Sequence, residues 1–261
     1  MGFKLIAADL DRTLLRSDGS VSDFTRDTIA ACRNAGVEFT FATGRMYCSA
    51  LPFARRLELQ LPLITYQGAL LEDAEGCVMH ALHLPQELAG AIAEILRKSE
   101  MHYNIYSDEK LYFSTFGQEV LDYARHIGVQ PLEAPQRLGQ IAVTQFGVFA
   151  EPTLVSQLQQ QIVAQFGDAV HTVISGGKFL EICHPEARKS YGLARLAEHM
   201  GIDRSQIIAI GDNNNDLDML RYAGIGVAVA NAVPAAKAAA DLLTASNDED
   251  GVARLIQQIV L

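Results

Sequence analysis

Strand-like and helix-like segments alternate at both ends of this 261-residue chain, and this alternation limits the possible folds more than any other feature. Hydrophobic periodicity predicts a strand over Lys4–Ala8, a helix over Phe24–Ala35 and a second strand over Val37–Ala42. A helix over Met46–Leu59 then precedes the apolar stretch Leu63–Tyr66, which we expect to continue the pattern. Parallel strands joined in this way need helices on both faces of their sheet.

The same alternation returns in the last third of the chain. The expected elements are a helix over Tyr191–His199, a strand over Ile207–Ile210, a helix over Leu217–Tyr222, a strand over Ile225–Val229 and a closing helix over Val252–Val260. Both ends therefore share one architecture. We predict an α/β fold with a doubly wound parallel-sheet core.

The middle of the chain has a different pattern. Its strand-like pieces read HYNIYSD, KLYFSTF, QIAVTQFGVFA and FLEICH, and two helical pieces cover Gln86–Lys98 and Pro152–Phe166. This mixture is typical of an α+β domain, and Pro85 and Pro185 restrain the chain at its two ends. We therefore expect a core domain over residues 1–82 and 185–261, interrupted by an inserted α+β domain over residues 83–184.

Composition excludes several classes of protein. The chain has 21 Lys and Arg against 31 Asp and Glu, so a net charge of -10 leaves no excess positive charge for nucleic acid or an anionic membrane. Apolar residues make up 49% of the chain, but no run of 18 suits a membrane helix. Four cysteines without CxxC spacing, and no secretory signal, favour a reduced, cytoplasmic protein.

Polar residues gather directly after three predicted strands. Asp9 and Asp11 follow the first strand, Thr43 and Gly44 follow the second, and the segment GDNNND follows the strand over Ile207–Ile210. Ligands of doubly wound sheets bind at the carboxyl ends of the strands, so these residues are expected on one edge.

Several carboxylates at one edge need a cation. Two carboxylates about 4 Å apart repel by roughly 4 kcal/mol at an effective dielectric constant of about 20. Bringing Asp9, Asp11, Asp212 and Asp216 together is therefore unfavourable unless a hard divalent ion is present. Oxygen ligands without a matching histidine or cysteine set favour Mg2+, which leaves room for a phosphate oxygen.

Four segments in order resemble the motifs of the haloacid dehalogenase (HAD) superfamily, closest to its Cof-type sugar-phosphatase branch. They read DLDRTLL, FATGR, ARKSYGLARL and IGDNNNDLDML, with the insertion between the second and the third. The resemblance spans nearly the whole chain, because VAVANAVPAAKAAAD and NDEDGVARLI resemble the closing segments of that branch. It implies an HAD-like core with a cap domain, and a magnesium-dependent phosphatase of a small phosphorylated metabolite, a sugar phosphate.

The resemblance also implies the roles of individual residues. Asp9 would be the nucleophile that takes the phosphoryl group, and Asp11 the acid that protonates the leaving oxygen and later activates water. Thr43, Gly44 and Lys189 would bind the phosphate.

The last motif would complete the metal site and the phosphate site. Asp212 would hold Mg2+ with the Asp9 carboxylate and the Asp11 backbone carbonyl. Asn215 would contact the phosphate, and Asp216 would support the metal ligands from behind.

Three residues depart from the family pattern. Arg12 and Ser190 stand where the family usually has glycine, and Gln67 stands where it usually has asparagine. A loop accustomed to glycine can need φ above zero at Arg12, and a guanidinium near the site could also bind substrate. Arg45 of the second motif is interpreted as structural.

Two other functions stay open at this point. A phosphomutase of the same superfamily would hand the phosphoryl group to a second hydroxyl instead of water. A phosphate-responsive signalling module would also use an acidic cluster, a threonine and a lysine on a doubly wound sheet. The substrate and the oligomeric state are left open, and the candidate substrate contacts in the insertion are Tyr103, Asn104, Tyr106, Lys110, Tyr112, Lys178 and Glu181.

Overall fold

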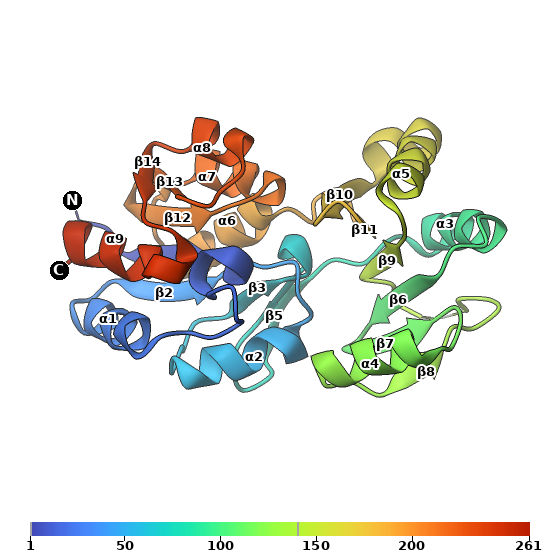
Figure 1. The fold of residues 1–261 in the computed structure, drawn as a ribbon, viewed down its shortest axis with the longest axis horizontal. Helices are drawn as coiled ribbons and strands as arrows, with labels where there is room; N and C mark the ends of the chain where they lie inside the picture. Colours follow the sequence, from blue (N-terminus) through green and yellow to red (C-terminus); the bar gives the residue numbers. More distant parts are fainter. Residues whose placement is uncertain (1, 140) are drawn as a thin grey trace. The chain divides into compact units, whose positions relative to one another are not determined.

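A computed structural model describes residues 2–139 and 141–261 and divides the chain into two compact units. Residues 1–80 and 188–261 form the first unit, so it is built from both ends of the chain, and residues 81–187 form the second (Figure 1). The predicted domain boundaries, after residues 82 and 184, stay predictions. Gln140, the first residue of the stretch QIAVTQFGVFA, lies outside the described residues.

The first unit contains a parallel sheet with the strand order β14-β13-β12-β1-β2. Its strands are β1 (Leu5–Ala8), β2 (Glu38–Phe41), β12 (Ile207–Gly211), β13 (Ile225–Val229) and β14 (Leu242–Thr244). All four pairings are parallel. From β1 the chain continues to β2 on one side, whereas β12, β13 and β14 follow on the other, so the strand order reverses between β1 and β12.

Helices cover both faces of this sheet. Strands β1 and β12 are buried at every residue, which requires cover on both sides. Helices α1 and α9 contact each other, and α7 contacts α6 and α8 (Figure 1). The helices of this unit are α1 (Asp23–Asn34), α2 (Tyr47–Arg56), α6 (Lys189–Met200), α7 (Leu217–Tyr222), α8 (Pro234–Ala239) and α9 (Gly251–Ile259). The predicted doubly wound parallel core is confirmed.

The stretch after α2 departs from the expected alternation. Strand β3 (Leu63–Thr65) meets the end of β2 through a parallel bridge between Ala42 and Ile64, and the Thr43 N–H donates to the Ile64 carbonyl at 2.8 Å. It also lies in a three-stranded sheet with β4 (Leu70–Glu72) and β5 (Val78–Ala81), and pairs with β4 in an antiparallel manner. The expectation that Leu63–Tyr66 continues the β-α-β pattern is therefore confirmed at this parallel bridge, whereas the antiparallel pairing with β4 was not expected and follows because the chain turns back after Thr65.

The second unit is the expected α+β domain. Its sheet has the order β10-β11-β9-β6-β7-β8. The strands are β6 (Tyr103–Ser107), β7 (Lys110–Phe113), β8 (Pro131–Glu133), β9 (Gln145–Phe149), β10 (His171–Ser175) and β11 (Phe179–Cys183). Helices α3 (Gln86–Lys98) and α5 (Pro152–Phe166) supply apolar side chains to its hydrophobic core.

Sequence reasoning missed one helix of this unit. Helix α4 (Gln118–Ile127) ends at Gly128, which has the left-handed φ of 79° that favours glycine after a helix. Apolar residues at Val120, Leu121 and Ala124 give the helix spacing. Within the described residues, every helix is too short or too polar to cross a membrane.

Candidate active site

The strand order places two aspartates side by side. Asp9 follows β1 and Asp212 follows β12, and these are the neighbouring strands between which the order reverses. The Asp9 backbone N–H donates to the carbonyl of Ile210 at 2.8 Å, which extends the pairing to the strand ends. Ligands of open α/β sheets bind at this position. The topology alone therefore brings the first and last motifs together.

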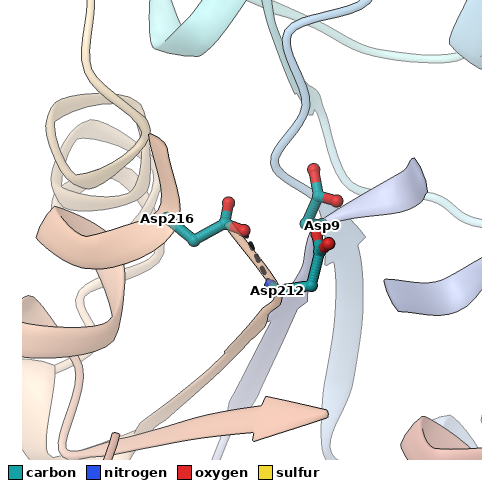
Figure 2. A group of neighbouring side chains, drawn as sticks. All are labelled: Asp9, Asp212 and Asp216. Atoms are coloured by element: carbon teal, nitrogen blue, oxygen red, sulfur yellow. Dashed lines mark hydrogen bonds between the residues drawn. The ribbon is translucent and has the colours of Figure 1, made fainter. Parts of the chain in front are cut away.

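Three carboxylates converge at this edge (Figure 2). One oxygen from each of Asp9, Asp212 and Asp216 lies within 4.8 Å of the others, and all three residues are buried. A Cβ at Gly211 would lie 2.5 Å from the Asp216 side chain, so glycine at the end of β12 lets the Asp216 carboxylate approach.

The third carboxylate, Asp216, is already fully engaged. Its Oδ2 accepts hydrogen bonds from the backbone N–H groups of Asp212 at 2.8 Å and Asn213 at 2.9 Å. Its Oδ1 accepts from the Lys189 ammonium at 2.6 Å. Asp216 therefore holds the loop and the lysine in place, while Asp9 and Asp212 are the oxygen donors better placed for a cation.

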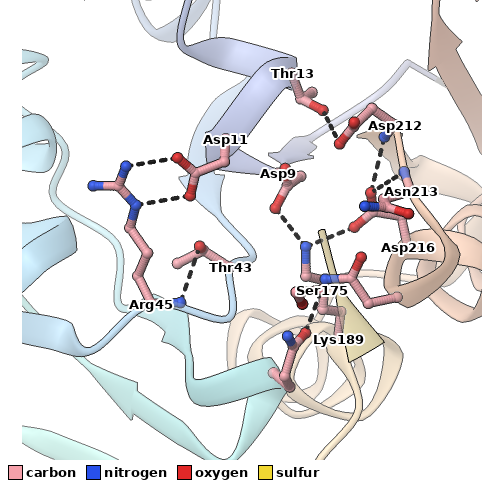
Figure 3. A network of polar contacts seen from close by, with 12 residues as sticks. Asp9, Asp11, Thr13, Thr43, Arg45, Ser175, Lys189, Asp212, Asn213 and Asp216 are labelled. Carbon is pink, nitrogen blue, oxygen red and sulfur yellow. Dashed lines mark hydrogen bonds and ion pairs between the residues drawn. The ribbon is translucent and has the colours of Figure 1, made fainter. Parts of the chain in front are cut away.

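Lys189 links the third motif to this cluster. Its Nζ lies 2.5 Å from Asp9 Oδ1 and 2.6 Å from Asp216 Oδ1, and its side chain has no exposed surface (Figure 3). Burial by itself would lower the pKa of Lys189, but the two carboxylates outweigh burial and raise that pKa above its usual value. The lysine is therefore held as a buried cation between two acids.

The cluster still carries excess negative charge. Burial raises the pKa of Asp9 well above its usual value, opposed by Lys189 and reinforced by Asp216 and Asp212. Burial and Asp216 raise the pKa of Asp212 to about 6, although Lys189 and Arg12 act in the opposite direction. The raised pKa values show that the negative charge of these buried carboxylates is not fully compensated. A hard divalent cation, which prefers oxygen ligands, would compensate that charge.

The loop after Asp9 turns sharply at Arg12. Arg12 has φ of 61° and ψ of 6°, a left-handed conformation that costs a residue other than glycine roughly 1–2 kcal/mol. The expectation of φ above zero at this position is confirmed. The turn is fixed by Asn231, whose Nδ2 donates to the Arg12 carbonyl at 2.7 Å, and by Thr13, whose Oγ1 donates to Asp212 Oδ1 at 3.3 Å. Arg12 Nε lies 3.8 Å from Asp212 Oδ2.

The second motif lies beside Asp11. Arg45 donates from Nε and Nη2 to the two carboxylate oxygens of Asp11, at 2.7 and 2.6 Å. Thr43 is buried, its N–H donates to Ile64 and its Oγ1 accepts from the Arg45 N–H at 3.2 Å. Gly44 lies between them in this turn.

Asn215 is held by Gln67, which stands where the family usually has asparagine. Its Nδ2 donates to Gln67 Oε1 at 3.1 Å, and Gln67 is buried with φ of 58°. Next to it, a Cβ at Gly68 would lie 2.0 Å from the Arg188 carbonyl oxygen. This close approach packs the turn against the start of α6, directly before Lys189.

Sequence reasoning missed a contact of the residue after Lys189, at the start of α6. The N–H and Oγ of Ser190 both donate to Asp218 Oδ2, at 3.1 and 2.6 Å. Ser190 was noted only as a departure from glycine. The signal in the sequence was a hydroxyl at Ser190 that can donate to a carboxylate, together with Asp218, two residues after Asp216.

Comparisons with known proteins agree with this geometry. Residues 6–256 match the family described as haloacid dehalogenase-like hydrolase. The 5-amino-6-(5-phospho-D-ribitylamino)uracil phosphatase YitU of Bacillus subtilis (strain 168) is 30% identical over 97% of this chain and 96% of its own. The crystal structure of a haloacid dehalogenase-like hydrolase from Bacteroides thetaiotaomicron is 28% identical, with a TM-score of 0.88 over 98% of this chain and 99% of its own.

The fold is also that of a sugar phosphatase of HAD subclass IIB, BT4131. That protein is 23% identical to this chain, with a TM-score of 0.86 over 98% of each chain, and the likeness concerns the fold. The resemblance carried by the four motifs is confirmed, and so is the expectation of an enzyme. The chain belongs to the haloacid dehalogenase-like hydrolase family.

Proposed function

We propose that this hydrolase is a magnesium-dependent phosphatase of a small phosphorylated metabolite, a sugar phosphate, and that it acts through an aspartyl phosphate on Asp9. The observation that carries the proposal is the buried cluster at the strand reversal, in which Lys189 contacts Asp9 while Asp212 lies beside it. Membership of a hydrolase family favours an enzyme over the signalling module.

The metal site would use Asp9, Asp212 and the Asp11 backbone carbonyl. Bound Mg2+ would supply a positive charge that neutralises the carboxylates and the phosphate oxygens. Asp216 would keep Lys189 and the Asp212 backbone in place, since it bonds both. The oxygen-only donors and the raised pKa values of Asp9 and Asp212 support this assignment.

The first chemical step would transfer the phosphoryl group to the enzyme. Lys189 holds Asp9 Oδ1, so we assign Oδ2 as the oxygen that attacks phosphorus. The bond from phosphorus to the leaving oxygen breaks, and Asp11 donates a proton to that oxygen. Thr43, Gly44, Lys189 and Asn215 would hold the phosphate during this transfer.

The second step would restore the enzyme. Asp11, now ionised, takes a proton from water, and the water oxygen attacks phosphorus. The bond from phosphorus to Asp9 breaks, which regenerates the Asp9 carboxylate and releases inorganic phosphate. Asp11 therefore serves as acid in the first step and as base in the second.

The inserted domain is proposed to select the substrate. Strand alternation separates its candidate residues: Asn104, Tyr106 and Glu181 lie on one face of its sheet with Gln145, whereas Tyr103 and Tyr112 pack with the apolar core on the other. Gln145 Nε2 donates to Glu181 Oε1 at 3.2 Å, and Ser175 Oγ donates to Glu181 Oε2 at 2.8 Å. Such a buried polar group can read hydroxyls, and the relative YitU is named for a phosphoribityl substrate.

The test is a screen of phosphorylated metabolites with detection of released phosphate, with magnesium and after chelation. We expect magnesium-dependent release, lost in Asp9→Asn. Isomer formation without phosphate release would instead indicate the phosphomutase. Glu181→Gln should reorder the substrates, whereas Tyr112→Phe, on the apolar face, should leave their ranking unchanged.

The proposed location is the cytoplasm. The chain has only four cysteines and none in CxxC spacing, which suits a reducing compartment. The proposed partner is a small phosphorylated metabolite, and the acidic balance of the chain argues against nucleic acid and an anionic membrane.

A further inference from the structure

Arg45 forms an ion pair with Asp11, the acid that the proposed reaction needs. Its Nε and Nη2 donate to the two oxygens of the Asp11 carboxylate at 2.7 and 2.6 Å, the paired geometry in which arginine binds planar anions. Figure 3 shows the Asp11 carboxylate facing Arg45, while the Asp9 carboxylate faces Lys189. With both oxygens engaged, Asp11 must leave Arg45 before it can exchange a proton with a leaving group.

The arginine itself is fixed by contacts other than Asp11. Its guanidinium carbon lies 5.3 Å from the centre of the Phe53 ring of α2, a cation–π contact. Its backbone N–H donates to Thr43 Oγ1 at 3.2 Å, and its carbonyl accepts from the Tyr66 N–H at 3.0 Å. The guanidinium would therefore stay in place, beside the proposed phosphate ligand Thr43, after Asp11 departs.

Exposure shows which ion pair of the site can open. The Asp11 side chain is 52% exposed and the Arg45 side chain 26%, whereas Lys189 and Asp216 are fully buried. Exposed ion pairs contribute little to stability, so the Asp11–Arg45 pair can exchange with an incoming anion. A phosphate group presents the same pair of oxygens to a guanidinium and carries more negative charge than one carboxylate.

We propose that Arg45 is a phosphate-binding residue, and that Asp11 occupies its guanidinium until the substrate phosphate displaces it. The displaced Asp11 carboxylate then takes a proton from water or from the phosphate monoanion of the substrate and passes it to the leaving oxygen, so phosphate binding and release of the acid are a single exchange. This inference rests on the proposed function, because it concerns the same site and the same acid. It replaces the interpretation of Arg45 as purely structural.

The experiment measures binding of inorganic phosphate by titration calorimetry, with magnesium, in four proteins: the unaltered chain, Asp11→Asn, Arg45→Gln and the double variant. Asparagine offers no charge to the guanidinium, so Asp11→Asn should tighten phosphate binding about 1.5- to 5-fold, the worth of an exposed ion pair. Arg45→Gln should weaken binding roughly 10- to 100-fold. In the Arg45→Gln background, Asp11→Asn should no longer tighten it.

The double variant separates exchange from simple charge repulsion. If Asp11 only repelled phosphate through space, Asp11→Asn would tighten binding equally with Arg45 and with Gln at position 45, which would overturn the inference. Arg55→Gln removes a charge from an exposed position of α2, the helix that follows Arg45, and should leave phosphate affinity unchanged. Thermal unfolding of each variant verifies that it is folded.

Failure of the inference and failure of the proposed function give different results. If the unaltered protein binds phosphate and the two substitutions act additively, only the exchange between Asp11 and Arg45 is wrong. If the unaltered protein binds no phosphate in the presence of magnesium, the proposed function is wrong as well. Arg45→Lys provides the conservative comparison. It keeps the positive charge but loses the two parallel N–H donors of the guanidinium, so its affinity for phosphate should fall between those of the unaltered chain and Arg45→Gln.

Discussion

The ammonium group of Lys189 lies 2.6 Å from Asp216 Oδ1, and neither side chain has surface exposed to solvent. A buried ion pair stabilises a fold little compared with an apolar pair, but loss of one partner leaves an uncompensated buried charge. Because Lys189 also contacts Asp9, its loss would leave the carboxylate cluster without its internal cation.

Replacement of this lysine should therefore destabilise the protein strongly. We expect Lys189→Met to lower the free energy of unfolding by about 3 to 5 kcal/mol in chelator, measured by urea denaturation. Lys237→Met, at an exposed position in α8, should change it by less than about 0.5 kcal/mol. Equal effects of the two substitutions would show that the buried triad carries no such energy.

Stabilisation by magnesium should depend on pH. Because the folded-state pKa of Asp212 is raised from 3.8 to about 6, its contribution to stability without metal is present below pH 3.8 and is lost as pH rises through about 6. Magnesium needs the ionised carboxylate, so its stabilising effect should appear over the same range. At about 100 times the dissociation constant it should raise the melting temperature by roughly 5 to 10 °C at pH 7.5, and by far less at pH 5.

Differential scanning fluorimetry with magnesium and with chelator at both pH values measures this effect. Asp212→Asn should abolish the magnesium shift at pH 7.5. An equal shift at pH 5 and pH 7.5 in the unaltered chain would count against a carboxylate metal site that includes Asp212.

Arg12 should weaken magnesium binding. Its guanidinium lies 3.8 Å from Asp212 Oδ2 and places a positive charge where a cation would bind. Arg12→Gly and Arg12→Ala should both tighten magnesium binding several-fold in calorimetric titration. Weaker binding in both variants would mean that Arg12 supports the metal site.

The same two variants separate charge from backbone strain. Arg12 has φ of 61°, which alanine would also have to adopt but glycine adopts without cost. Arg12→Gly should therefore be more stable than Arg12→Ala by about 1 kcal/mol in urea denaturation. Equal stability would indicate that the loop relaxes out of the left-handed conformation.

Two residues of the cluster could be found from sequence because each directly follows a strand end. Asp9 and Asp212 come directly after β1 and β12, so once a parallel sheet is inferred, their proximity follows from the strand order alone. The positive φ of Arg12 could also be anticipated, since the family pattern has glycine there. These features depend on local sequence and topology.

Contacts between distant side chains could not be predicted in the same way. The pairing of Arg45 with Asp11 joins residues 34 positions apart, and only the packing of two loops decides it. The antiparallel pairing of β3 with β4 was missed for a similar reason, because a short apolar stretch such as Leu63–Tyr66 fits either kind of sheet. Helix α4 has the apolar spacing of a helix but only 10 residues, fewer than three turns, so the pattern has little length in which to repeat.

The effect of Asp11→Asn should depend on the leaving group. A sugar alkoxide needs a proton to depart, so hydrolysis of a sugar phosphate should slow by about 100- to 10,000-fold. A nitrophenolate leaves without help, so the first step with nitrophenyl phosphate should be spared in part. Rapid mixing should show a burst of nitrophenol followed by slow turnover, because Asp11 is also needed to activate water. Equal slowing of both substrates with no burst would remove the acid and base assignment.

The central claim is that Asp9 carries the phosphoryl group. The most direct measurement is rapid acid quenching of the enzyme during turnover of nitrophenyl phosphate with magnesium, followed by mass spectrometry of the peptide that contains residues 9 and 11. We predict a phosphoryl adduct on Asp9 that forms and decays at rates compatible with turnover, accumulates in Asp11→Asn and is absent from Asp9→Asn, which should be inactive. Turnover by Asp9→Asn at the unaltered rate, or a phosphoryl group on another residue, would contradict the account.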